Sequence, residues 1–295
     1  MHTPNTSFNH VNYLWNEEKA AQLEGNEVDL FLYRSNLLGA DLRITNYGGG
    51  NTSCKTKELD PLTKTWVEVM WIKGSGGDIG TMTRSGLAGL YVDKLNALKG
   101  IYRGLEHEDE MVGLFGHCLY DLASKAPSID TPLHGFLPFK HIDHLHPDAA
   151  IAIAAAKDGE EITKTLWKGT IAWVPWQRPG FDLGLKLREA LDKNPGIRGI
   201  MLGGHGLFTW GDTSYDCYLN SLEVIETASA YLAENYGKKR PVFGGQKINS
   251  LDPDQRKSQA AKLAPLLRGL ASSESRMVGT FSDKEVVLEF SNSQD

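Results

Sequence analysis

Two histidines separated by one residue form the segment with the clearest chemical potential. His144 and His146 lie in a stretch, residues 143–146, that is expected to end a β-strand. In a strand, residues i and i+2 point to the same face, so both imidazoles could reach one ion. Zinc and similar divalent metals favour imidazole nitrogens as ligands. By itself, a single His-x-His also fits two solvent-exposed or core histidines beside a turn.

A third histidine has the surroundings expected of a metal ligand. His205 follows a predicted apolar strand, residues 199–202, and is flanked by Gly204 and Gly206. Small neighbours allow a backbone to approach a site closely. Three neutral imidazoles leave one position open on a tetrahedral zinc ion, which is the pattern of catalytic rather than structural sites. The alternative is that His205 is an ordinary turn residue.

Two glycine-rich segments indicate binding of an anion. Residues 48–53 read Gly-Gly-Gly-Asn-Thr-Ser, and residues 73–77 read Lys-Gly-Ser-Gly-Gly. Successive backbone N–H groups in such turns form a concavity suited to phosphate. Neither segment has the spacing of the Walker A or dinucleotide-binding motifs. Each is also compatible with a tight turn that binds nothing.

One carboxylate precedes the histidine pair. Asp130 follows Pro127 and Ser128 and lies about fifteen residues before the histidines. A carboxylate beside a metal can serve as a general base or as a further ligand. Asp130 before Thr-Pro is equally typical of a turn.

The elements that would position these residues alternate between strands and helices. Strands are expected at 43–45, 66–72, 143–146, 170–174, 199–202, 277–281 and 285–290. Helices are expected at 27–38, 84–99, 108–123, 183–192 and 212–236, and after the capping residue Asp252. Such alternation indicates a layered α/β domain.

Length, composition and charge exclude several classes of protein. A chain of 295 residues can bury a large core without disulfides. Its 41% hydrophobic and 23% charged residues argue against a disordered chain or a coiled coil. A net charge of −6 without a long basic run argues against nucleic acid or a membrane as a partner. Three scattered cysteines and no N-terminal signal segment predict a cytoplasmic protein.

The combination of motifs resembles the class II aldolase and adducin family, which includes zinc-dependent sugar-phosphate aldolases and epimerases. The matching motifs are Gly50-Asn51-Thr52-Ser53, Ser75-Gly76, Pro127 to Asp130, His144 with His146, and His205-Gly206-Leu207. They occur in the family's order over about residues 28–235. Longer stretches at 35–41, 73–78 and 106–111 look like the branch of rhamnulose-1-phosphate aldolases that is fused to a lactaldehyde dehydrogenase.

The resemblance implies a fold and a domain organisation. The fold would be a three-layer α/β/α arrangement with a central mixed, mostly antiparallel sheet. A class II aldolase domain would cover residues 1–245. Residues 246–295 would form a C-terminal extension that packs on this domain or leads to a dehydrogenase domain. Members of the family are usually tetramers, so a homotetramer is expected.

The resemblance also assigns roles to the candidate residues. His144, His146 and His205 would hold Zn²⁺ or another divalent metal. Asp130 would be the catalytic acid or base, although the better-known aldolases carry the longer Glu there. The phosphate of a small-molecule sugar phosphate would be held by Asn51, Ser53, Lys73, Ser75, Gly76 and Ser128.

The implied reaction is cleavage of a ketose 1-phosphate. In the branch that the sequence resembles, L-rhamnulose 1-phosphate yields dihydroxyacetone phosphate and lactaldehyde. An epimerase of the same fold would use the same three histidines. A non-catalytic adducin-like scaffold is the alternative of a different class, and it need not retain the histidines. Their presence therefore favours an enzyme.

Overall fold

The computed structural model describes residues 7–45, 49–236 and 245–293. The chain divides into two compact units, Met1–Leu232 and Ala233–Asp295. Every candidate site residue belongs to the first unit. The expected domain boundary at residue 245 stays a prediction.

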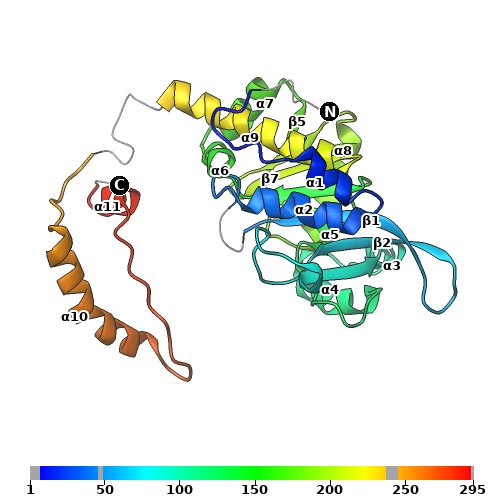
Figure 1. Cartoon of the computed structure of the whole chain (residues 1–295), viewed down its shortest axis with the longest axis horizontal. Coiled ribbons are helices and arrows are strands. Elements are labelled where there is room, and N and C mark those ends of the chain that lie inside the picture. Colours follow the sequence, from blue (N-terminus) through cyan, green and yellow to red (C-terminus); the bar gives the residue numbers. More distant parts are fainter. Residues whose placement is uncertain (1–6, 46–48, 237–244, 294–295) are drawn as a thin grey trace. The chain divides into compact units, whose positions relative to one another are not determined.

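A seven-stranded sheet forms the centre of the first unit (Figure 1). Its strands are β1 (Asn51–Leu59), β2 (Trp66–Lys73), β3 (Leu87–Tyr91), β4 (His141–Leu145), β5 (Ile171–Val174), β6 (Gly199–Leu202) and β7 (Gly206–Gly211). They lie in the order β3-β2-β1-β4-β7-β6-β5. Among the described residues, only β5 and β6 pair in parallel. The prediction of a mixed, mostly antiparallel sheet is confirmed.

Helices cover both faces of the sheet, as the three-layer prediction requires (Figure 1). The first face carries α1 (Glu17–Gln22), α2 (Glu27–Gly39), α6 (Asp148–Ala154), α7 (Gly159–Trp167) and α9 (Ser214–Tyr236). Side chains from these helices pack against Leu145, Met201 and Leu207 of the sheet. Burial of each such side chain contributes about 1.5–3 kcal/mol to folding.

The second face carries α3 (Val92–Ala97), α4 (Glu108–Leu114), α5 (Thr131–Gly135) and α8 (Phe181–Lys193). Short 3₁₀ turns lie at Arg84–Gly86, Leu98–Gly100, Leu105–His107 and Phe115–Cys118. Ile142, Ile200 and Phe208 of the sheet pack against α5 and α8. Because strand residues alternate between faces, each strand supplies apolar side chains to both helical layers.

Side-chain capping explains where several helices begin. The Asn26 side chain accepts a hydrogen bond from the backbone N–H of Asp29 (3.2 Å) at the start of α2. Thr213 Oγ1 accepts from Asp216 N–H (3.0 Å) at the start of α9. These oxygens satisfy N–H groups that have no partner within the helix.

Three expected elements of the first unit are wrong or incomplete. Residues 43 and 44 lie in a turn, and residue 45 belongs to neither a helix nor a strand. The helix expected at 84–99 is a 3₁₀ turn followed by β3 and α3. All five residues of β3 are buried, so its sequence lacks the alternation that identifies a strand. The helix expected at 108–123 ends at Leu114, where a 3₁₀ turn begins.

The second unit contains α10 (Pro253–Ala271) and α11 (Glu285–Ser291). The Asp252 side chain accepts from Gln255 N–H (2.9 Å), so the helix predicted after this cap is confirmed. The strand expected at 285–290 is wrong, because these residues form α11. Residues 277–281 form neither a helix nor a strand. No helix in the described ranges is long and apolar enough to cross a membrane.

Candidate active site

The three histidines of the predicted metal centre lie together. His144 is in β4, His146 follows the end of that strand, and His205 occupies the turn between β6 and β7. Leu145 of β4 pairs with Leu207 of β7, which places this turn beside the end of β4. One ligand atom from each imidazole lies within 4.8 Å of the other two. The Nε2 atoms of His144 and His146 are 3.1 Å apart.

Glycine is required at two positions around the histidines. A Cβ on Gly206 would lie 2.7 Å from the Leu145 carbonyl oxygen and 2.8 Å from the His146 ring. Gly50 has a φ of +70°, and a Cβ there would lie 2.5 Å from the His144 carbonyl oxygen. Any larger residue would displace backbone that carries a candidate ligand.

Hydrogen bonding fixes which nitrogens face the centre. The Leu207 carbonyl accepts from His144 Nδ1 (3.2 Å), so Nδ1 carries the proton and Nε2 keeps its lone pair. His205 Nδ1 is buried and has no hydrogen-bond partner among the described residues. Three imidazoles that each bring a nitrogen to one point fit a divalent ion such as zinc.

Burial keeps the three imidazoles neutral. It lowers the pKa of His146 to about 4 and also lowers the pKa values of His144 and His205. The like charges of neighbouring imidazoles lower the pKa values of His144 and His146 further. Neutral imidazole is the form that binds a metal, so these residues need not lose protons at pH 7 to do so.

Asp130 is connected to this centre through Asn51. Asn51 of β1 lies directly opposite His144 of β4 in the sheet, which puts both side chains on one face. Asn51 Nδ2 donates to Asp130 Oδ2 and to Ser128 Oγ (3.2 Å). Burial raises the pKa of Asp130, while the ammonium of Lys73 opposes that rise. The carboxyl therefore takes up a proton more readily than an exposed aspartate does.

The second glycine segment contacts the stretch that leads into Ser128 and Asp130. Ser75 N–H donates to the Ala126 carbonyl (2.9 Å), close in sequence to Ser128. Lys73 is buried, and its Nζ donates to the carbonyls of Gly76 and Gly77 (3.3 Å each). Gly76 has a φ of +73° and open space around it, and Ser75 is exposed. The turn therefore presents backbone and a hydroxyl to solvent.

Ser53 is the predicted phosphate contact that the structure places elsewhere. It is fully buried in β1, two residues beyond Asn51, and pairs with Ile142 in the sheet. Its hydroxyl lies 2.8 Å from His134 Nδ1. This hydroxyl faces His134 of α5, so it is not part of the proposed phosphate site. The start of the first glycine segment, Gly48, lies outside the described residues.

The structure contains a buried ion pair near the histidines that the sequence did not predict. Arg34 of α2 and Asp143 of β4 are both fully buried, with Nη2 and Oδ1 3.1 Å apart. Arg34 Nη1 also donates to His141 Nδ1 (2.8 Å), and its Nη2 donates to the Ser53 carbonyl (3.0 Å). The guanidinium thus ties α2 to both β1 and β4, the strands that carry Asn51 and His144. Arginine is usually exposed, so the sequence offers no signal for this role.

Comparison with known proteins identifies one family. A model of the family described as "Class II Aldolase and Adducin N-terminal domain" matches residues 32–232. Among curated proteins, the chain is 41% identical over 283 residues to the uncharacterized oxidoreductase YuxG of Bacillus subtilis (strain 168). That alignment covers 96% of this chain and 40% of YuxG, so the chain spans less than half the length of this relative.

Solved structures agree with the fold. The N-terminal class II aldolase domain of a conserved protein from Thermoplasma acidophilum has a TM-score of 0.65 and 28% identity, over 77% of this chain and all of that one. A sugar-phosphate aldolase from Thermotoga maritima has a TM-score of 0.53 and 16% identity, over 73% of this chain and 98% of that one. At such low identity the second likeness concerns the fold alone.

Proposed function

Because the chain belongs to the class II aldolase and adducin family, we propose that it is a metal-dependent aldehyde-lyase that cleaves a ketose 1-phosphate. The observation that carries this proposal is the contact of the Asp130 carboxyl with Asn51, which lies directly opposite His144 in the sheet. Asn51 thus links a candidate proton-transfer group to the strand pair that carries His144, and a retro-aldol reaction needs such a group near the metal ligands.

His144, His146 and His205 would hold the metal. A divalent ion such as Zn²⁺ bound there would supply Lewis-acid polarisation of the substrate carbonyl. The protein's own part is to keep the three rings neutral and oriented. Burial keeps the rings neutral, the Leu207 carbonyl orients His144, and Gly206 leaves room for the rings of His144 and His146.

Asp130 would exchange the proton at the reacting carbon. Cleavage of the C3–C4 bond requires loss of the C4 hydroxyl proton and delivery of a proton to C3 of the dihydroxyacetone phosphate product. The raised pKa of Asp130 suits a group that must carry a proton and give it up near neutral pH. Asn51 holds one carboxylate oxygen of Asp130 and so fixes its direction.

The substrate phosphate would bind where the second glycine segment meets residues 126–130. Ser75, Gly76, Ser128 and Asn51 offer hydroxyl, amide and backbone donors, and Lys73 adds a positive charge behind the turn. We propose L-rhamnulose 1-phosphate, with lactaldehyde as the second product, on the strength of the motif resemblance.

The molecular context is proposed on the same basis. Residues 1–245 form the aldolase domain, and 246–295 form an extension that, in a longer polypeptide, leads to a further domain. The enzyme is a cytoplasmic homotetramer, which size-exclusion chromatography with light scattering would test. The free cysteines Cys54, Cys118 and Cys217 are all buried and suit a reducing compartment.

A product assay on a panel of ketose 1-phosphates, with and without added zinc, tests the function. We expect zinc-dependent release of dihydroxyacetone phosphate together with free aldehyde, fastest for L-rhamnulose 1-phosphate. A change of sugar stereochemistry without free aldehyde would indicate an epimerase and contradict the lyase assignment. No turnover of any zinc-loaded sample would favour a scaffold. His117→Ala, which alters an exposed histidine, is the matched control for variants of the three ligands.

A further inference from the structure

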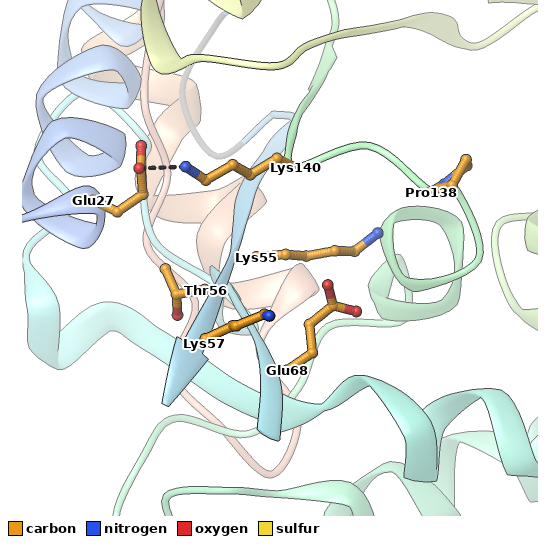
Figure 2. A pocket seen from close by; sticks show the side chains of 7 residues that line it. All are labelled: Glu27, Lys55, Thr56, Lys57, Glu68, Pro138 and Lys140. Atoms are coloured by element: carbon orange, nitrogen blue, oxygen red, sulfur yellow. Dashed lines mark hydrogen bonds and ion pairs between the residues drawn. The ribbon is translucent and has the colours of Figure 1, made fainter. Parts of the chain in front are cut away.

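A cavity of about 480 Å³ lies beside β1 (Figure 2). It is lined by Glu27, Lys55, Thr56, Lys57, Glu68, Pro138 and Lys140. Lys55 is four residues along β1 from Asn51, which corresponds to about 13 Å at the usual rise per residue. None of the lining residues belongs to the metal or phosphate sites proposed above.

The cavity exists because two neighbouring strands differ in length. β4 begins at His141, which pairs with Cys54, whereas β1 continues to Leu59. Lys55 N–H still bonds to the Lys140 carbonyl (2.8 Å), and beyond that point β1 has only β2 as a neighbour. The cavity occupies the notch left where β4 would otherwise continue.

A buried lysine faces this notch. Lys55 is only 6% exposed, and its Nζ donates to the Leu137 carbonyl. It forms no ion pair with any carboxylate in the described part of the chain. An ammonium held out of water needs a partner of opposite charge to be stable. Burial lowers the pKa of Lys55 to about 8, and the charge of Glu68 offsets that shift only in part.

Two nearby cations are already neutralised. Lys140 Nζ is paired with Glu27 Oε2 (2.5 Å) at one side of the cavity. Arg188, which lies close enough to lower the pKa of Lys55, is paired with Asp192 (2.9 Å). These pairs leave Glu68 as the one lining carboxylate that could offset the charge of Lys55.

The remaining charges around the cavity are mainly positive. Within the described residues, the lining lysines Lys55 and Lys57 form no ion pair, and Glu68 is the one unpaired carboxylate of the lining. Glu68 lies opposite Lys57 in the β1–β2 ladder, and Figure 2 draws its carboxylate between the Lys55 and Lys57 ammonium groups in this view. Two unpaired lysines against one unpaired carboxylate leave an excess of positive charge in the lining, and the nearby ammonium of Lys99 adds to it.

We propose that this cavity binds a small oxyanion with two negative charges, such as phosphate or a dicarboxylate, between Lys55 and Lys57. The anion supplies the charge that the buried ammonium lacks, and Glu68 competes with it from within the chain. Both ammonium groups donate to the ligand oxygens through charge-assisted hydrogen bonds. This site is independent of the proposed aldolase reaction.

Calorimetric titration of the full-length, zinc-loaded protein with inorganic phosphate tests the proposal, with succinate as a second arm. Every protein tested carries the double substitution Asn51→Ala/Ser75→Ala, which weakens binding of the anion at the proposed active site. In that background, Lys55→Met should weaken binding about tenfold, as for one lost charge-assisted hydrogen bond. Glu68→Gln should tighten binding several-fold, because it removes the internal competitor. Lys157→Met, which removes an exposed lysine, should have no effect.

Comparing the phosphate and succinate titrations identifies the kind of anion, and several outcomes would contradict the proposed site. Tighter binding of phosphate or of succinate identifies the class of oxyanion that the cavity prefers. Absence of binding by both anions in the background variant rejects the site, as does unchanged affinity in Lys55→Met. If Lys55→Met does not fold, Glu68→Gln decides: equal or weaker binding than in the background variant contradicts the proposal. Because turnover of ketose phosphates is not a readout, failure here leaves the proposed function unaffected.

Discussion

The ligand set of the candidate metal centre depends on three individual side chains. Replacing His146 by Ala removes one of the convergent nitrogens and leaves the two others in place. Because affinity depends on the complete ligand set, we expect zinc affinity to fall at least tenfold and lyase activity to fall with it. Metal analysis after dialysis against a buffered zinc concentration measures the loss. His117→Ala should retain full zinc, and equal zinc content in both variants would contradict the assignment.

The proposed catalytic role of Asp130 can be tested with a substitution that removes its basicity. Asp130→Asn keeps the shape but removes the basicity, so proton exchange at C3 of dihydroxyacetone phosphate should fall about 10²–10⁴-fold. Zinc content should be unchanged. Exchange at the wild-type rate in a zinc-loaded variant would show that another group moves the proton.

Asp130→Asn should also change how the stability of the folded protein depends on pH. Burial raises the pKa of Asp130 in the folded state, so the folded protein favours the protonated carboxyl. Wild-type stability therefore contains a contribution that is present at low pH and is lost as pH rises through the raised pKa. Asp130→Asn lacks that loss, so its melting temperature should exceed the wild-type value at pH 8 and approach it at pH 4. A variant that is less stable at pH 8 would contradict the direction of the shift.

Ser75 tests the phosphate site separately from the metal. Its hydroxyl is exposed on a turn whose backbone is already fixed by the bond to Ala126. Ser75→Ala should raise KM for the phosphorylated ketose about tenfold, as for one lost hydrogen bond to a charged group, and leave zinc content unchanged. Steady-state kinetics with ketose 1-phosphate and with the unphosphorylated ketose separate the two effects. An equal rise in KM for both substrates would argue against contact with the phosphate.

At the scale of elements, the position of β4 depends on the ion pair between Arg34 and Asp143. Arg34→Met leaves the Asp143 carboxylate buried without its partner, which typically costs about 3–5 kcal/mol of the free energy of unfolding. Asp143 Oδ2 retains the Ser221 hydroxyl (2.9 Å), so part of its hydrogen bonding survives. Urea denaturation measures the loss.

The double variant Arg34→Met/Asp143→Leu separates charge burial from packing. If the cost comes from an unpaired charge, removing that charge should recover much of the stability lost in Arg34→Met. An additive loss in the double variant would show that both residues act mainly through packing. Arg84→Met, which breaks an exposed pair with Asp29, is the control and should cost less than about 1 kcal/mol.

At the scale of the whole molecule, the hydrophobic clusters of the first unit are built from residues up to Leu232. We therefore expect a chain that ends at residue 245 to fold, to bind zinc and to cleave the same substrate. Calorimetry and metal analysis of residues 1–245 test this expectation. Loss of cooperative unfolding would contradict the proposed domain boundary.

The sequence by itself determined the local features of the fold and of the site. A spacing of two residues placed His144 and His146 on one face of a strand, and glycines marked the turns around His205 and Ser75. Local periodicity also predicted β2, β6 and the helices α2 and α9, with small differences at their ends. These inferences succeed because side-chain direction and turn geometry depend on neighbours in the chain.

Only the tertiary structure decided which of these local features meet. The pairing of β1 with β4 sets Asn51 opposite His144, and the same strand carries Ser53 beneath α5. Burial of Arg34 and Lys55 likewise follows from the packing of distant segments, against the usual exposure of both residue types. Such contacts depend on strand order and strand length across the sheet, which no local pattern of residues specifies.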